Sequence, residues 1–111
     1  MADKIKLVQG DTGPQLQLTL TDELTGLPID LTGATVTMKF REAGSDTTLF
    51  TRTGFVNLET APAGKCVITW GTGNLDVEAG SYEGEIEVIF SDAMRQTVYD
   101  LLKFTVRQDF N

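Results

Sequence analysis

The sequence predicts an all-β domain, a sandwich of two antiparallel sheets with roughly seven to nine strands. Three observations predict this class. Apolar and polar residues alternate along many short segments, which is the pattern of antiparallel strands with one buried face. Turn residues interrupt the chain about every 8–12 positions, and no segment has the periodicity of a long helix. A small β-barrel is the second choice.

Composition limits the number of domains and the classes of partner. A chain of 111 residues suits one domain, residues 1–111, built around one core. The net charge is −7, from 16 acidic and 9 scattered basic residues, so we expect no nucleic-acid partner. No apolar run reaches the roughly 18 residues of a membrane span, and the first residues lack the apolar core of a signal peptide. We therefore expect no membrane partner and a protein made in the cytoplasm, either kept there or carried out in an assembly.

The reactive residue types are few. Cys66 is the single cysteine and the chain has no histidine, which excludes an intrachain disulfide, a Cys/His zinc site and nucleophiles activated by histidine. Cys66 shares one strand face with Ile68 and Trp70, so we expect a buried, inert thiol. We predict no enzymatic activity and no cofactor.

Carboxylates leave two alternatives open. The pairs Glu83/Glu85 and Asp76/Glu78 could serve a hydrolase, although carboxylates in this pattern more often form a solvated strand face. Calcium could bind at aspartates in the turns, but no loop has a dense acidic pattern. The candidate calcium ligands are Asp11, Asp30 and Asp76.

The first third of the chain predicts two strands and an irregular connection. Residues 4–8 alternate as an edge strand, and residues 15–21 form a half-buried strand with the leucines inward. After Pro28, the carboxylate of Asp30 is expected to accept hydrogen bonds from backbone N–H groups ahead of it. The apolar residues on either side of Asp30, Ile29 and Leu31, should close one end of the core.

The middle of the chain predicts a strand with a cationic outward face and one ambiguous segment. Residues 35–41 alternate, with Lys39 and Arg41 outward. Leu49 and Phe50 follow within a polar stretch. They form either an edge strand that folds one side chain onto the core, or an apolar anchor for a neighbouring subunit.

The last part of the chain predicts a central strand in a long hairpin. Residues 65–70 form a strand, whereas the inward positions of the short apolar segment at residues 54–58 stay unassigned. Residues 82–90 and 95–106 pair as the hairpin. The outward residues Glu83, Glu85 and Glu87 of its first arm are expected to lie beside Lys39 and Arg41 on the adjacent strand.

Residues 78–84, Glu-Ala-Gly-Ser-Tyr-Glu-Gly, resemble the tyrosine corner of immunoglobulin-like domains. The resemblance implies that the Tyr82 hydroxyl bonds to backbone between residues 75 and 78, and the tight entry to the strand predicts a positive φ at Gly80. Gly84 stands where many such domains carry their second disulfide cysteine. Trp70 is not at the usual early-strand position of the core tryptophan.

Four motifs resemble the N-terminal domain of the upper baseplate protein of tailed bacteriophages, over most of the chain. The most telling is Asp-Leu-Thr-Gly-Ala at residues 30–34. The full set is Gly10-Asp11-Thr12 with Pro14 and the leucines 16, 18 and 20; residues 28–36; Ile68-Thr69-Trp70; and residues 79–83. Two departures stand out: Ser91-Asp92-Ala93-Met94 replaces the family's glycine in the final hairpin turn, and the family continues into a linker or fibre beyond the position of Asn111.

This resemblance implies a non-enzymatic structural component of a virion, a tail or baseplate adaptor that docks a fibre or receptor-binding part. Its expected partners are other virion proteins, in repeated copies within a symmetric assembly. One alternative is a decoration protein of the phage head. Another is a carbohydrate-binding, adhesive sandwich, which would need Trp70, Tyr82 and Tyr99 exposed on one face.

Overall fold

The computed structural model describes residues 5–22, 24–98 and 101–109, and it confirms the all-β prediction. These residues form eight strands and one short 3-10 helix. The elements are β1 (Ile5–Val8), β2 (Gln15–Thr19), β3 (Thr35–Glu42), β4 (Thr48–Thr53), η1 (Ala61–Ala63), β5 (Lys65–Thr69), β6 (Gly80–Ile89), β7 (Arg95–Thr97) and β8 (Leu102–Arg107). No helix in these ranges is long and apolar enough to cross a membrane.

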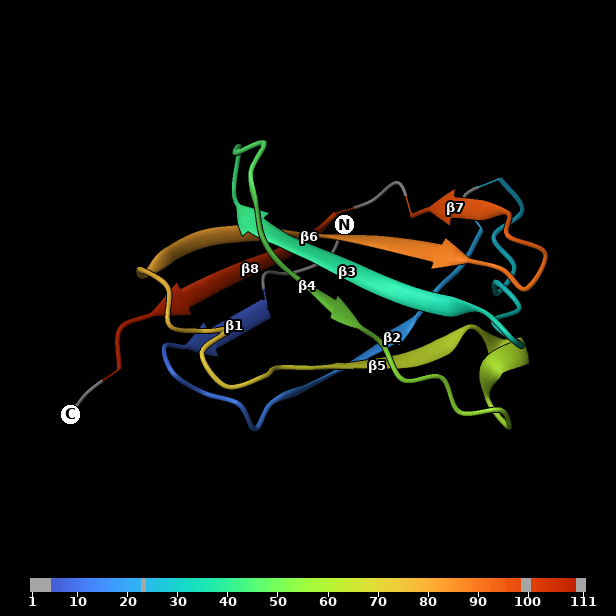
Figure 1. Ribbon diagram of the computed structural model, residues 1–111, viewed down its shortest axis with the longest axis horizontal. Helices are drawn as coiled ribbons and strands as arrows, with labels where there is room; N and C mark the ends of the chain where they lie inside the picture. The colour runs from blue at the N-terminus through green and yellow to red at the C-terminus, as the bar shows by residue number, and fades with distance from the viewer. Residues whose placement is uncertain (1–4, 23, 99–100, 110–111) are drawn as a thin grey trace.

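The strands form two packed sheets, and Figure 1 shows β6 and β3 of the larger sheet above β5 of the smaller one. The larger sheet has the order β1-β8-β6-β3-β4, with β7 also paired to β6, and the smaller sheet consists of β2 and β5. Strand β6 is central and β1 lies at an edge, as the sequence predicted. The fold is therefore a two-sheet sandwich.

One pairing corrects the prediction of purely antiparallel sheets, because β1 runs parallel to β8. The turn after β1 carries the chain into the other sheet, where β2 pairs with β5. A hairpin between β1 and β2 is thus ruled out, and the free side of β8, the last strand, accepts β1 instead. All other pairings between the strands described here are antiparallel.

The core lies between the sheets and is centred on Phe40. The Phe40 ring stacks on Tyr82 at 5.1 Å between centroids and contacts Phe104 at 5.2 Å. Trp70 meets the Phe40 ring edge-on at 5.6 Å. Aromatic pairs of this kind each contribute about 0.5–1.5 kcal/mol beyond the burial of their area. This cluster joins β3, β6 and β8 to the end of β5.

Gly84 makes room for that cluster. A Cβ atom at this position would lie 2.9 Å from the Met38 sulfur and 2.9 Å from a ring carbon of Phe104. The position that holds a cysteine in many immunoglobulin-like domains is therefore filled here by aromatic packing. A larger residue would push β3 and β8 away from β6.

Two predicted segments differ in detail. Residues 54–58 form no strand, since only Phe55 pairs, in an isolated bridge with Val67. The predicted turn at residues 61–64 contains the 3-10 helix η1. The Asn57 carbonyl oxygen accepts hydrogen bonds from the N–H groups of Thr60 and Ala61, which turns the chain into this helix. The second arm of the long hairpin is divided into β7 and β8, and Tyr99 and Asp100 lie outside the described residues.

Candidate functional site

The tyrosine corner is present as predicted. The Tyr82 hydroxyl donates a hydrogen bond of 2.5 Å to the Glu78 carbonyl oxygen, and the residue is only 4% exposed. Burial, followed by the nearby charges of Glu42 and Glu78, raises the pKa of Tyr82. Gly80 has a positive φ of +157°, which confirms the second prediction for this corner. The corner fixes the entry into the central strand, so its role is structural.

The Asp30 turn is also confirmed. One carboxylate oxygen of Asp30 accepts hydrogen bonds from the Thr32 backbone N–H, at 3.0 Å, and from the Thr32 hydroxyl, at 2.6 Å. These hydrogen bonds lower the pKa of Asp30. The turn holds Ile29 and Leu31 in the core, and the Leu31 N–H donates to the Ala61 carbonyl at 2.9 Å. Asp30 thus closes one end of the sandwich.

Trp70 lies inside the core, which overturns the aromatic platform suggested for sugar binding. It is 4% exposed and packs edge-on against the rings of Phe104, at 5.8 Å, and Phe50, at 6.1 Å. Tyr82 is equally buried, and Tyr99 lies outside the residues that the structure describes. Trp70 and Tyr82 therefore offer no face to a saccharide.

Cys66 is buried as expected. It is 3% exposed, and this burial raises the pKa of its thiol to about 11. A thiol with so high a pKa stays protonated at neutral pH, and the protonated form is a poor nucleophile. Cys66 therefore acts as a small apolar residue of the core.

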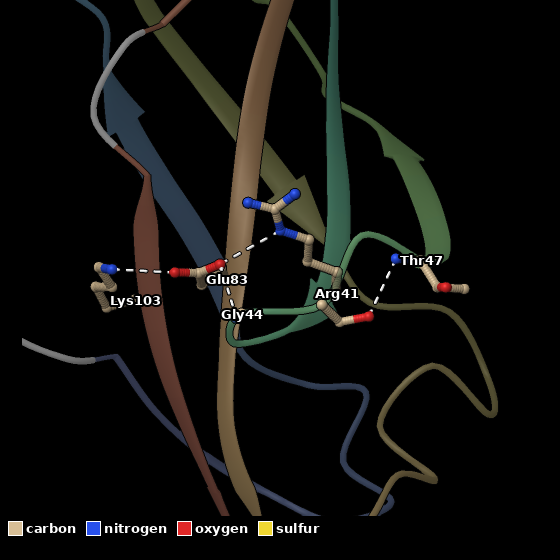
Figure 2. A network of polar contacts seen from close by, with 6 residues as sticks. Arg41, Gly44, Thr47, Glu83 and Lys103 are labelled. Carbon is tan, nitrogen blue, oxygen red and sulfur yellow. Dashed lines mark hydrogen bonds and ion pairs between the residues drawn. The ribbon is translucent and has the colours of Figure 1, made fainter.

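The outward row of glutamates on β6 lies in register with cations on both neighbouring strands. Figure 2 shows the polar contacts of one of them, Glu83. Glu83 accepts a hydrogen bond from Lys103 on β8 at 3.1 Å and another from Arg41 on β3 at 3.3 Å. The Gly44 backbone N–H also approaches the carboxylate, at 3.4 Å. The Lys103 hydrogen bond is the largest of the contacts that lower the pKa of Glu83.

Arg41 pairs with Glu83 and Lys39 with Glu85, which confirms the prediction that these charged rows lie on adjacent strands. The predicted antiparallel pairing of residues 82–90 with residues 95–106 is also present, since β6 pairs with β7 and β8. It places Lys103 opposite Glu83, an ionic partner that the prediction did not name. Glu83 joins three strands through its two ion pairs. We conclude that the glutamates on the outer face of the larger sheet help to hold β6 to its neighbouring strands.

Leu49 and Phe50 lie on the edge strand β4 and have different surroundings. The Phe50 ring stacks on Phe40 at 4.8 Å and is partly buried against the core. Leu49 is 48% exposed, and the pairing register shifts beside it, since Phe40 opposes Phe50 whereas Arg41 opposes Thr48. Such a bulge gives an edge strand a side chain directed away from the regular pattern. Phe50 is thus a core residue, and Leu49 alone is free to contact a partner.

Arg52 holds β4 in place. Its Nε donates a hydrogen bond of 2.7 Å to the Thr69 carbonyl oxygen at the end of β5, so it links the edges of the two sheets. Together with the partly buried Phe50 ring, this link keeps β4 on the sandwich. The contacts of Arg52 and Phe50 therefore hold the core-facing side of β4, and Leu49 stays exposed to solvent on this strand.

Sequence analysis missed a hollow on the outer face of the smaller sheet. It has a volume of about 390 Å³ and lies beside Phe55, which is 65% exposed. The one sequence signal was an apolar segment that follows Gly54 and has no clear inward face. The sequence of this segment indicates that an apolar residue could be exposed, but it does not indicate which residues surround it.

The fold and these residues define a small sandwich with a fixed edge strand, a salt-bridged outer face and a hollow with a mixed polar and apolar lining. No known family model matches the chain, and no curated protein matches it.

Proposed function

We propose that the protein is a non-enzymatic, immunoglobulin-like structural module of a bacteriophage virion, a tail or baseplate adaptor that docks a fibre or receptor-binding part. The motif resemblance carries this proposal. Its motifs coincide with residues that build the sandwich here: the Asp30 turn and the Tyr82 corner each fix one entry to the core. The two-sheet architecture is the one that the resemblance implies.

The proposed docking element is the edge strand β4 with Leu49. An edge strand offers unpaired backbone groups to a neighbour, and an exposed leucine beside them supplies apolar area to bury. Arg52 and Phe50 fix the inner side of the strand, which lowers the entropy lost on docking. The other exposed residues of β4 are Thr48, Thr51 and Thr53, so Leu49 is the apolar residue on the exposed side of this strand.

The charge of the chain favours specific docking over indiscriminate clustering. A net charge of −7 makes copies of the chain repel one another unless a defined contact holds them. A symmetric particle supplies such a defined contact, because each copy of the chain meets the same complementary neighbour. We therefore expect ordered assembly of the chain to take place on docking within the particle. Sedimentation in dilute buffer tests this, and one tight oligomer would count against the adaptor role.

Incorporation into particles tests the docking element. Particles would be assembled from a phage genome lacking the gene, with the parent chain, Leu49→Asp or Thr51→Asp supplied in trans. Thr51→Asp is the matched control because it adds the same charge to an exposed residue of the same strand. We expect Leu49→Asp to fold and to be missing from purified particles, with Thr51→Asp retained. Normal incorporation of Leu49→Asp would overturn the assignment of β4 as the docking element.

Decoration of the head is the second candidate, and it uses the same kind of contact. Separating purified particles into heads and tails distinguishes the two sites. The adaptor proposal predicts that the chain remains with the tail fraction. Recovery with the heads would replace it by the decoration role.

A further inference from the structure

Phe55 is an exposed aromatic side chain on a rigid backbone. Its N–H donates to the Val67 carbonyl at 2.7 Å, and the Val67 N–H donates back to the Phe55 carbonyl at 2.9 Å. Immediately before it, the Gly54 N–H donates to Val36 of the larger sheet at 2.7 Å. The chain is therefore held at both sheets where it crosses between them, and the phenyl ring projects from a fixed point although it is 65% exposed.

The tight crossing also explains why a glycine precedes the phenylalanine. A Cβ atom at Gly54 would lie 3.0 Å from the Ile68 side chain and 3.4 Å from the Val67 carbonyl oxygen. The backbone passes close against β5 at this point, which places Phe55 beside Val67 in an isolated antiparallel bridge. Figure 1 shows this segment running next to β5 before it reaches η1.

A hollow of about 390 Å³ lies beside Phe55, and its lining combines polar and apolar groups in about equal measure. The side chains of Gln17 and Thr19 from β2 and of Lys65 from β5 form no hydrogen bond with other described residues, so they are available to a ligand. The Asn57 side-chain oxygen accepts the Glu59 N–H at 2.9 Å, which leaves its NH₂ group free to donate. The volume falls within the range of small-molecule sites, about 300–1,000 Å³.

The charge of the lining differs from that of the whole protein. None of the described residues that line the hollow is acidic, although the chain contains 16 acidic residues. Lys65 is the charged residue of the lining. The hollow is thus locally cationic on a protein whose net charge is −7. An anionic group is attracted there and repelled by most of the remaining surface.

We propose that this hollow binds an acidic saccharide, with one sugar ring stacked on Phe55 and a carboxylate facing Lys65. The apolar face of a pyranose ring can cover an exposed phenyl ring, which removes apolar area of both from water. Amide groups donate and accept side by side, so Gln17 suits neighbouring sugar hydroxyls, and Asn57 adds a donor. This site differs from the Trp70 and Tyr82 platform, which is buried, and it goes beyond the proposed virion role without depending on it.

The polar groups of the lining favour a saccharide over a protein partner. The centre of a protein interface is typically depleted of lysine and built around close-packed aromatic or aliphatic anchors. Here the single aromatic ring borders a hollow whose other side chains include two amides, two hydroxyls and an ammonium group. These five hydrogen-bonding side chains suit a ligand that is itself rich in hydroxyl groups.

The test is a titration of the ¹⁵N-labelled full chain with trigalacturonic acid and, separately, with the neutral maltotriose, followed by amide chemical shifts. We expect trigalacturonic acid to shift the amides of Gln17, Phe55 and Val67 and to bind at least tenfold more tightly than maltotriose. Phe55→Ala should weaken binding at least tenfold, whereas Leu58→Ala is the matched control. Leu58 is 76% exposed in the same segment and does not line the hollow, so its replacement should leave the affinity unchanged.

Lys65→Gln separates the two parts of the proposal. It should remove the preference for trigalacturonic acid over maltotriose while the stacking on Phe55 remains. The amide spectra of each unliganded variant report whether it is folded, so a loss of binding is not mistaken for unfolding. Shifts confined to other surfaces, equal binding by the parent and Phe55→Ala, or no shifts with either saccharide would overturn the proposal. Loss of Phe55→Ala from phage particles, without any saccharide binding by the parent, would assign the hollow to a protein partner instead.

Discussion

Replacing Phe50 with Asp tests whether residue 50 belongs to the core and residue 49 to the surface. The Phe50 ring is partly buried and stacks on Phe40 at 4.8 Å, whereas Leu49 is 48% exposed. Removing a fully buried phenylalanine side chain costs about 3–5 kcal/mol, so the half-buried ring accounts for about 2 kcal/mol. A carboxylate placed against the aromatic cluster adds up to about 2 kcal/mol of desolvation. Phe50→Asp should therefore lower the free energy of unfolding by roughly 2–4 kcal/mol.

Urea denaturation followed by tryptophan fluorescence measures this loss. Trp70 is the single tryptophan, and its ring lies 6.1 Å from Phe50, so its emission reports on this part of the core. Leu49→Asp is the matched control, because the same change one residue earlier should alter stability by less than about 0.5 kcal/mol. Equal stability of Phe50→Asp and the parent, or equal losses in the two variants, would refute the division between them.

Four further predictions concern the corner, the thiol and the ion pairs. Tyr82→Phe should lower the free energy of unfolding by about 1–3 kcal/mol, since it leaves the Glu78 carbonyl without its 2.5 Å donor. Parent-like stability in urea would contradict the corner. Gly80→Ala should cost about 1 kcal/mol, because alanine disfavours positive φ; a thermal melt unchanged from the parent would show otherwise. Cys66, with a pKa raised to about 11 by burial, should react with a disulfide reagent at pH 8 only in urea, so rapid labelling of the folded protein would exclude its burial. The pKa of Glu83 is lowered on folding, so its contacts stabilise the protein above the ordinary glutamate pKa of about 4.3 and lose this effect as the pH falls through the lower folded value. Stability should fall more steeply with acid in the parent than in Glu83→Gln, and identical pH profiles would deny this role.

The strands with one buried face could be predicted from the sequence, because their apolar and polar residues alternate as the side chains alternate between core and solvent. In β3 and β6 the inward residues follow one another without interruption, and the opposite charges of their outward residues predicted that the two strands are neighbours. The corner and the Asp30 turn were equally accessible, because both are local arrangements. In each, a side chain bonds to backbone within four residues of itself.

The remaining features depend on distant parts of the chain. β1 and β8 lie near opposite ends of the described chain, so no local sequence pattern predicts that they pair in parallel. The exposure of Phe55 follows from its bridge to Val67 and from the close passage of Gly54 between the sheets. The different surroundings of Leu49 and Phe50 depend on a register shift opposite Arg41, which alternation alone does not reveal.

Mass spectrometry of purified phage particles tests the proposed virion role most directly. The particles should be those released from cells in which the gene encoding this chain is expressed, separated from soluble protein by density. The proposal predicts that the chain bands with the particles, in a constant ratio to the tail or baseplate proteins over repeated purifications. Its recovery only in the soluble fraction would contradict a structural role in the virion.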